Sequence, residues 1–367
     1  MSVAKLFEPM SMARGPAMKN RFMLAPLTNQ QSHPDGRLSD DEFRWLTMRA
    51  TGGFGLTMTC AAHVQAVGQG FAGQLGIFGD QHLEGLARLA SDIKAKGSVA
   101  SAQLHHAGNR SPKDLVGQPV CPSDDAKSGA RALTLAEVER LRDDFIAAGK
   151  RAEKAGFDGI EVHGAHGYIL AQFLSADVNH RDDRYGGTLE NRARIVFEII
   201  DGIRAGCRSD FQIGLRLSPE RFGLKLGEIR DVAAEVLRQG KIDYLDMSLW
   251  DYAKEPNEPE FQGRTLMSYF TDLPRGNVRL GAAGKIMGAK DAQAVIEAGC
   301  DYVLIGRAAI LRHDFPKRRT RRNSRAAPVG HAIQGTPSLN RASFCAVIGL
   351  AMRNPWIWST PISRNTT

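Results

Sequence analysis

Two histidines and a tyrosine lie within six positions of one another, directly after the short strand-like stretch 159–162 (GIEV). They are His163, His166 and Tyr168. Imidazoles can hydrogen-bond an electron-rich oxygen and a phenol can deliver a proton, so the trio suits a reaction in which negative charge develops on oxygen. A structural histidine pair is one alternative. A zinc pair is another, but zinc needs three or four ligands and the other histidines show no matching carboxylate pattern, so we expect no metal site.

Further polar residues stand in or after other apolar stretches. Gln103 ends one of them, and Arg216 lies between two leucines in another. A glutamine side chain offers one donor and one acceptor, which suits the edge of a heterocycle, and a buried arginine needs a partner for its charge. Late in the chain, Gly284, Gly306 and Arg307 follow two more such stretches. Glycine lets a backbone approach an anion, so we expect a phosphate site there, although the glycines could merely turn the chain.

These residues need a scaffold that brings many strand ends together. Near-continuous apolar runs alternate with amphipathic stretches, a pattern typical of parallel strands buried on both faces and joined by helices. The expected strands are 22–28, 55–62, 98–106, 159–165, 212–218, 243–250, 278–284 and 301–308, and the expected helices include 81–95, 190–206, 228–239 and 289–298. Ser39 and Thr134 begin two capping-box sequences at further helix starts. The pattern predicts the α/β class and a (β/α)8 TIM barrel, with its site at the carboxyl ends of the strands.

Composition and charge exclude several classes of protein. The 367 residues contain no apolar run of membrane-spanning length and begin without a signal-peptide pattern, so we expect a cytoplasmic protein that does not enter a membrane. Five scattered cysteines argue against zinc ribbons, iron–sulfur clusters and a disulfide framework. Residues 317–367 hold nine of the 48 Lys and Arg and none of the 40 Asp and Glu, so residues 1–316 carry a net charge of −1. The net charge of +8 is therefore no argument for nucleic-acid binding.

Several longer motifs follow one another between residues 5 and 316. They are LFEPMSM with KNRFMLAPLT, GQGFAGQLGIF, AQLHHAGNR, EVHGAHGYILAQFLS, NHRDDRYGGTLENRARIVFEII, GLRLSP and DYVLIGRA. In this order they resemble the old yellow enzyme family of FMN-dependent NAD(P)H:flavin oxidoreductases, and HGAHGYILAQFLS followed by RDDRYGG is its most specific signature. The resemblance implies tightly bound FMN, NADH or NADPH as reductant, and a small-molecule substrate. The implied activity passes a hydride through the flavin to the activated C=C bond of an α,β-unsaturated carbonyl or nitro compound.

The resemblance also assigns roles to single residues. It implies that His163 and His166 bind the carbonyl or nitro oxygen of the substrate and that Tyr168 donates the proton. The implied flavin-binding residues are Ala25, Pro26, Leu27, Thr28, Ala61, Gln103 and Arg216, with Gly284, Gly306 and Arg307 at the phosphate. Two other activities stay open: an amine or N-methyl demethylase of the same family, and a cofactor-free barrel lyase or aldolase, for which no strand lysine stands out as a Schiff-base candidate.

Two parts of the chain depart from the family pattern. Residues 29–31 (NQQ) stand where many members place a tyrosine, which makes the expected pocket wall more polar. Residues 317–367 match none of the family's usual closing segment and contain no acidic residue. We therefore expect two parts: an FMN-binding barrel at 1–316 and a basic tail at 317–367 that is out of frame or disordered. Because a closing helix would then be missing, homo-oligomer formation stays open, and we expect weaker FMN retention than in relatives with the usual ending.

Overall fold

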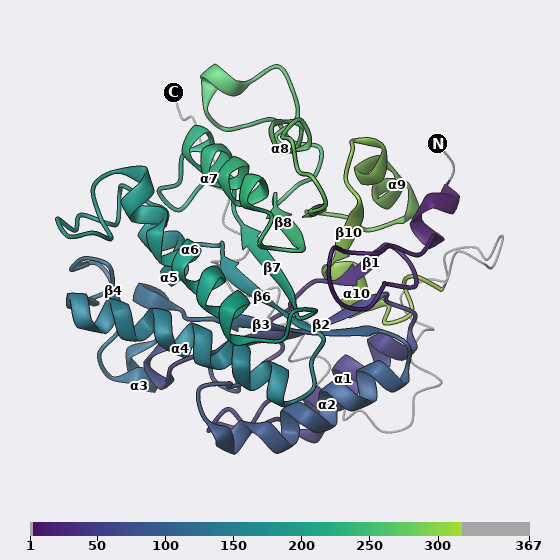
Figure 1. Ribbon diagram of the computed structural model, residues 1–367, viewed down its shortest axis with the longest axis horizontal. Coiled ribbons are helices and arrows are strands. Elements are labelled where there is room, and N and C mark those ends of the chain that lie inside the picture. Colours follow the sequence, from purple (N-terminus) through teal and green to yellow (C-terminus); the bar gives the residue numbers. More distant parts are fainter. Residues whose placement is uncertain (1–2, 318–367) are drawn as a thin grey trace, which may run out of the picture. The chain divides into compact units, whose positions relative to one another are not determined.

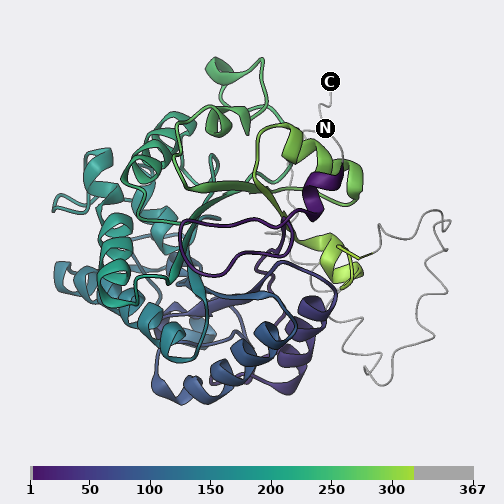
Figure 2. The same cartoon turned by 45° about the vertical axis from the view of Figure 1, so that its right-hand side comes forward.

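Eight parallel strands close into a barrel with helices packed around it (Figures 1 and 2). This computed structural model describes residues 3–317, so the predicted basic tail lies outside the described residues apart from Lys317. The strands, in their order around the barrel, are β1 (Phe22–Leu24), β10 (Tyr302–Ile305), β9 (Arg279–Ala283), β8 (Tyr244–Ser248), β7 (Gln212–Leu217), β6 (Gly159–Gly164), β3 (Val99–His105) and β2 (Leu56–His63). The predicted (β/α)8 TIM barrel is confirmed.

The helices lie outside the strands, as the alternating pattern predicts (Figure 2). They are α1 (Asp40–Thr51), α2 (Leu83–Ala95), α3 (Lys113–Val116), α4 (Leu135–Lys154), α5 (Ile169–Leu174), α6 (Leu189–Gly206), α7 (Leu226–Gln239), α8 (Ser268–Thr271), α9 (Ala289–Glu297) and α10 (Arg307–Leu311). A small parallel pair, β4 (Val120–Cys121) and β5 (Arg131–Ala132), was not predicted. No helix between residues 3 and 317 is long and apolar enough to cross a bilayer.

Two predicted strands are shorter than their apolar stretches. The strand expected over 22–28 ends at Leu24, after which the Ala25 N–H still donates to Ile305 (3.1 Å). Pro26 has no N–H and cannot continue the ladder. The strand expected over 301–308 ends at Ile305 because Arg307 already begins α10. Both shortened ends are at the carboxyl side of the barrel, where the backbone becomes available for a site.

One of the two predicted capping boxes is complete. At the start of α4, the Thr134 hydroxyl accepts from the Glu137 N–H and the Glu137 carboxylate accepts from the Thr134 N–H. At α1, Ser39 accepts from the Glu42 N–H, but the Glu42 carboxylate does not return to the Ser39 backbone. It is fully buried and accepts from Ser32 in the loop after β1. The second half of that prediction was wrong because a tertiary partner took the carboxylate.

The barrel interior is filled from within and closed at its amino end. An inner cluster of buried side chains is separate from the larger layer between strands and helices. Met10 and Met18 pair in an antiparallel bridge and join this inner cluster. The segment that carries them crosses the barrel (purple in Figure 2), and Gln212 at the start of β7 donates to its backbone at Arg14 and Pro16. The opposite, carboxyl end remains for ligand binding.

Inside the barrel, two tyrosine rings lie against glycines of neighbouring strands. Tyr244 and Tyr302 are fully buried, and a Cβ atom placed on Gly214 would lie 2.1 Å from Cζ of Tyr244. Overpacking a core usually costs about 1–3 kcal/mol, and a buried ring between strands has little freedom to move. We expect Gly214→Ala to lower the free energy of unfolding by about 3 kcal/mol in urea titrations. The control, Gly227→Ala, places its Cβ 3.6 Å from its nearest neighbour; equal losses in both variants would contradict this account.

Candidate active site

The strand register brings the predicted polar residues side by side at the carboxyl end of the barrel. His163 on β6 pairs with Arg216 on β7, and Arg216 pairs with Asp246 on β8. On the other side of β6, Gln103 on β3 pairs with Glu161. Paired residues of parallel strands point to the same face of the sheet. The side chains therefore form one continuous polar layer across four strands.

His163 and His166 contact each other. Nε2 of His163 lies 3.2 Å from Nδ1 of His166, and Nε2 of His166 lies 2.7 Å from the Ser248 hydroxyl. The His166 N–H donates to the Ser218 hydroxyl at 2.9 Å, which holds the backbone at a positive φ of 60°. Burial, followed by the charges of Arg216 and Arg110, keeps the pKa of His166 well below 6.5, and burial does the same for His163. Both imidazoles are neutral at pH 7, so each has one N–H, which a ligand oxygen can receive by displacing the contacts with His166 and Ser248.

Tyr168 lies against this pair with its hydroxyl unused. Its ring meets His163 edge-on at 5.3 Å and His105 at 4.4 Å between centroids. The Arg110 guanidinium covers the ring at 4.9 Å. Within residues 3–317 the Tyr168 hydroxyl forms no hydrogen bond, so it is available to a ligand. Gln74 fixes the neighbouring His105, with Nε2 of Gln74 3.0 Å from Nδ1 of His105.

Beneath the histidines lies a fully buried network of charged and amide groups. Gln103 donates from Nε2 to Glu161 at 2.7 Å. Nε of Arg216 lies 3.1 Å from Asp246, and its Nη2 donates to Ser248 at 3.4 Å. Burial raises the pKa of both carboxyls above their ordinary values, while the Arg216 charge opposes this shift. The network holds the side chains of Gln103 and Arg216 in place below the histidine pair.

The remaining predicted residues encircle the same end of the barrel. Ala25, Pro26, Leu27 and Thr28 follow β1, Ala61 lies on β2, Gly284 follows β9, and Gly306 with Arg307 follows β10. Since β10 lies between β1 and β9, these residues neighbour one another around the rim. A Cβ on Gly284 would come within 3.0 Å of the backbone nitrogens of Asp251 and Tyr252, so a larger residue would crowd that turn. The structure thus brings all the predicted site residues to one end of the barrel.

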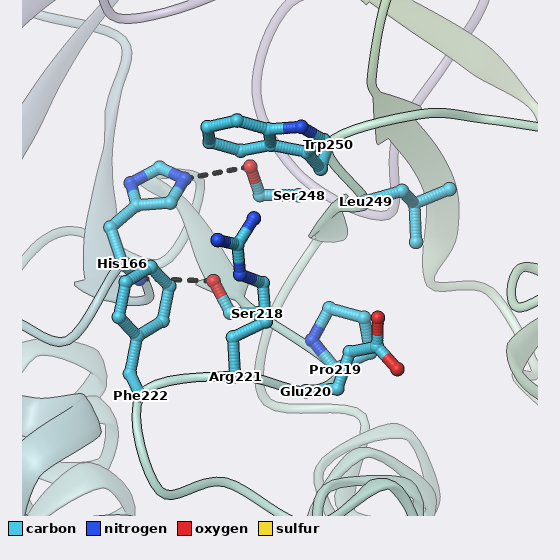
Figure 3. A pocket seen from close by; sticks show the side chains of 9 residues that line it. All are labelled: His166, Ser218, Pro219, Glu220, Arg221, Phe222, Ser248, Leu249 and Trp250. Carbon is cyan, nitrogen blue, oxygen red and sulfur yellow. Dashed lines mark hydrogen bonds between the residues drawn. The ribbon is translucent and has the colours of Figure 1, made fainter. Parts of the chain in front are cut away.

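A pocket opens beside His166, between the loops that follow β6, β7 and β8 (Figure 3). Its lining residues are His166, Ser218, Pro219, Glu220, Arg221, Phe222, Ser248, Leu249 and Trp250. Of these residues, only His166 has a role that was predicted from the sequence. The hydroxyls of Ser218 and Ser248 stand at ends of predicted strands, which was a usable signal. Glu161 and Asp246, carboxylates inside apolar strands, were another missed signal, since a buried carboxylate needs partners.

The buried histidines predict a loss of stability in mild acid. Burial lowers the pKa of His63 and His82 to about 4 and of His106 to about 3, and it also lowers the pKa of His105, His163 and His166. Below pH 6.5 these histidines bind protons in the unfolded chain but not in the folded chain. Their contribution to the free energy of unfolding is therefore complete above pH 6.5 and is lost as pH falls. Each fully buried histidine contributes about 1.4 kcal/mol per pH unit in that range.

Glu42, Glu161 and Asp246 act in the opposite direction, because burial raises their pKa values and this favours the folded chain as pH falls. Three carboxyls oppose six histidines, so we expect the free energy of unfolding to decrease from pH 7 to pH 5. Urea titrations at pH 7.5, 6.5 and 5.5 measure this directly. A constant free energy of unfolding over these three values would show that the unfolded chain takes up no net protons and would contradict the prediction.

Comparisons with known proteins identify the family. The model of the NADH:flavin oxidoreductase / NADH oxidase family matches residues 5–324. The probable NADH-dependent flavin oxidoreductase YqiG of Bacillus subtilis is 37% identical over 318 residues, which cover 83% of this chain and 85% of that protein. The structure of the old yellow enzyme homologue from Zymomonas mobilis matches with a TM-score of 0.76 and 28% identity, over 86% of this chain and 92% of that one.

A larger protein contains a similar barrel. In the 2-naphthoyl-CoA reductase complex the match has a TM-score of 0.78 and 26% identity, over 87% of this chain. This chain spans about half of that one, 52% of its length. The family model, the relatives and the polar layer at the carboxyl end of the barrel agree. The chain belongs to the NADH:flavin oxidoreductase / NADH oxidase family and is an FMN-dependent oxidoreductase of the old yellow enzyme type, with NADH or NADPH as reductant.

Proposed function

We propose that the chain reduces the activated C=C bond of an α,β-unsaturated carbonyl or nitro compound. One observation carries the proposal: two neutral imidazoles, His163 and His166, lie beside the unused hydroxyl of Tyr168. Neutral N–H donors can stabilise charge that develops on an oxygen, and they do so more strongly in a buried site. A phenol within reach of the same ligand can supply a proton to carbon. Reduction of an activated alkene needs both functions in one place.

The buried layer fits the FMN that the family uses. Nη1 of Arg216 and Nε2 of His105 are buried without hydrogen-bond partners in the described part of the chain. Gln103 donates to Glu161, and its Oε1 accepts no hydrogen bond within residues 3–317. The pyrimidine edge of a flavin presents acceptors and an N–H, so it would satisfy both Arg216 and Gln103. When bound, FMN supplies hydride transfer, which no side chain of the protein can perform.

The rim residues would hold the rest of this cofactor. We assign Ala25, Pro26, Leu27, Thr28 and Ala61 to the walls of the ring system. Gly284, Gly306 and Arg307 would bind the phosphate, since they follow strands seven and eight of the barrel, where such sites recur. The Glu161–Gln103 and Asp246–Arg216 contacts then fix which atoms of the two side chains face the cofactor.

Side chains of the protein bind the substrate oxygen and supply the proton. His163 and His166 bind and polarise the substrate oxygen. Ser218 holds the strained backbone of His166, and Ser248 contacts its imidazole. Tyr168 holds the proton that completes the product. We assign the polar residues 29–31 to the wall of the substrate pocket. This division makes Tyr168 important for the alkene step alone and leaves reduction by NADH independent of its hydroxyl.

Anaerobic half-reactions test the proposal. The purified holoenzyme is reduced with one equivalent of NADH, and 2-cyclohexenone is then added while the flavin absorbance is followed. We expect the enone to reoxidise the enzyme and to yield cyclohexanone. Tyr168→Phe should slow this step about 10²-fold and leave the NADH step within twofold. Product formation from an N-methyl amine, with no reaction of the enone, would replace this proposal by the demethylase alternative. The family assignment already sets the cofactor-free lyase aside.

The division of the chain remains a proposal as well. The composition change supports a barrel at 1–316 and a separate basic tail at 317–367, and the family match ends close to it, at residue 324. Association into a homo-oligomer is likewise a prediction. Light scattering of the holoenzyme measures the oligomeric state, and FMN content after gel filtration measures the expected weak retention.

A further inference from the structure

The pocket beside His166 is positively charged. Glu220 is the carboxylate among its lining residues, and it accepts from Lys254 and from the Asn257 N–H at 2.7 Å. In Figure 3 this carboxylate is turned away from His166, while the Arg221 guanidinium points toward Ser248 and Trp250. Arg221 forms no ion pair with any residue between 3 and 317. The pocket therefore presents a cation that no carboxylate of the described chain neutralises.

A second arginine without a carboxylate partner in the described chain, Arg110, also lies near Phe222. The guanidinium of Arg110 is 5.7 Å from the Phe222 ring centroid, and that of Arg221 is 5.9 Å from it. Arg221 also lies 4.6 Å from the Trp250 ring. Aromatic contacts orient a guanidinium without removing its charge. Arg110 donates to the His166 carbonyl and, like Arg221, has no carboxylate partner in the described chain. Both cations therefore lie next to the substrate-oxygen site with N–H groups free for an anion.

The backbone around these groups is strained. Of the six non-glycine residues with positive φ in the described chain, four line this pocket: His166, Arg221, Phe222 and Trp250. Such conformations cost about 1–3 kcal/mol each and gather at binding sites, where they fix side-chain direction. Phe222 and Trp250 also keep 36% and 37% of their surfaces exposed. Strain, exposed aromatic rings and an unpaired cation coincide at the mouth of one pocket.

We propose that Arg221, assisted by Arg110, binds a negatively charged carboxylate or phosphate group of the molecules that react at His163 and His166. A guanidinium can bind such a group with two parallel hydrogen bonds. The anion can belong to an acidic alkene substrate or to the phosphates of the nicotinamide dinucleotide. The first source rests on the proposed alkene reduction, whereas the second requires only the oxidoreductase activity of the family.

Matched ligands with and without charge separate these cases. The alkene pair is 3-maleimidopropionate and N-propylmaleimide, which share one reactive ring and differ in charge. The hydride-donor pair is NADH and 1-benzyl-1,4-dihydronicotinamide, which lacks phosphate. Stopped-flow measurements on the holoenzyme give an apparent dissociation constant for each ligand. The variants are Arg221→Gln, Arg221→Lys and a control, Arg238→Gln, whose arginine is exposed on α7 and paired with Glu235.

We expect Arg221→Gln to weaken at least one charged ligand about tenfold and its neutral counterpart less than twofold. Arg221→Lys should retain most of the preference, and Arg238→Gln all of it. Weakening of 3-maleimidopropionate identifies an acidic substrate, and weakening of NADH alone identifies the dinucleotide phosphates; both support the site. Equal changes for charged and neutral ligands, or no change, overturn it. If the wild-type enzyme reduces neither maleimide, the proposed alkene reduction fails, and the hydride-donor pair still decides the anion site.

Discussion

Replacing His163 by alanine should slow reoxidation of the reduced enzyme by an enone about 10²–10³-fold, the range seen when one donor to a developing oxyanion is removed. His163 is 4% exposed, and its imidazole is neutral because burial lowers its pKa. Its N–H therefore acts in a poorly solvated site, where water cannot replace it. The rate of the single-turnover reaction, followed through the flavin absorbance under anaerobic conditions, measures the effect.

Two further variants make this prediction specific. His163→Asn keeps an N–H donor near the same position and should recover at least tenfold of the lost rate. His33→Ala removes an exposed histidine from the loop after β1 and should leave the rate within twofold. If His163→Ala reacts within threefold of wild type, the substrate oxygen is bound elsewhere. His166, which meets Ser248 and the pocket, would then be the donor to examine.

The histidine pair works in its neutral form. Both imidazoles carry pKa values well below 6.5, and Arg216 and Arg110 contribute to this lowering. A protonated pair would repel these arginines, so the working form is the neutral one. Because both imidazoles are neutral, Nε2 of His163 can lie 3.2 Å from Nδ1 of His166 although Arg216 and Arg110 are close by. The positive charge near the substrate oxygen therefore comes from Arg216 and Arg110, and not from protonation of the imidazoles.

The sequence predicted the residues that stand at strand ends but not their partners. His163, His166 and Tyr168 share one short segment, so local spacing was enough to group them. Gln103 and Arg216 could be placed at the same end of the barrel because parallel strands end together. Their contacts with Glu161 and Asp246 depend on which strands are neighbours and on the register between them. The order of the strands around a barrel can be inferred from their order in the chain. Which residue pairs with which on the neighbouring strand cannot be inferred in this way.

Some features depended on tertiary contacts that no local pattern encodes. Glu42 matched a capping box, but its carboxylate accepts a hydrogen bond from Ser32 instead. This partner lies in the loop after β1, which packs against the helix only in the folded chain. The positive φ of Arg221 and Trp250 has no local signal either, since neither residue type favours that conformation. The surrounding fold imposes both. The residues that line the pocket beside His166 were therefore not predictable from local patterns, apart from His166 itself and the two serines at strand ends.

The buried pair of Arg216 and Asp246 carries the second large prediction. The two side chains are 5% and 0% exposed, and the carboxylate is the ion-pair partner of the guanidinium among the described residues. Removing one member of a buried pair leaves an uncompensated charge and costs about 3–5 kcal/mol. We therefore expect Asp246→Asn to lower the free energy of unfolding by that amount at pH 8, where the wild-type carboxyl is ionised. Urea unfolding of wild type and variant measures it.

Two comparisons separate loss of charge balance from loss of packing. Asp41→Asn removes a carboxylate from an exposed pair with Arg44 and should change stability by less than about 1 kcal/mol. The double variant Arg216→Leu/Asp246→Leu removes both charges and should recover most of the stability lost in Asp246→Asn, because well-packed apolar residues can replace a buried pair. The same double variant should no longer retain FMN, since Arg216 is assigned to the cofactor. A double variant as unstable as the single one would show that Asp246 stabilises the barrel through packing, and the role of the pair in placing Arg216 would then have to be abandoned.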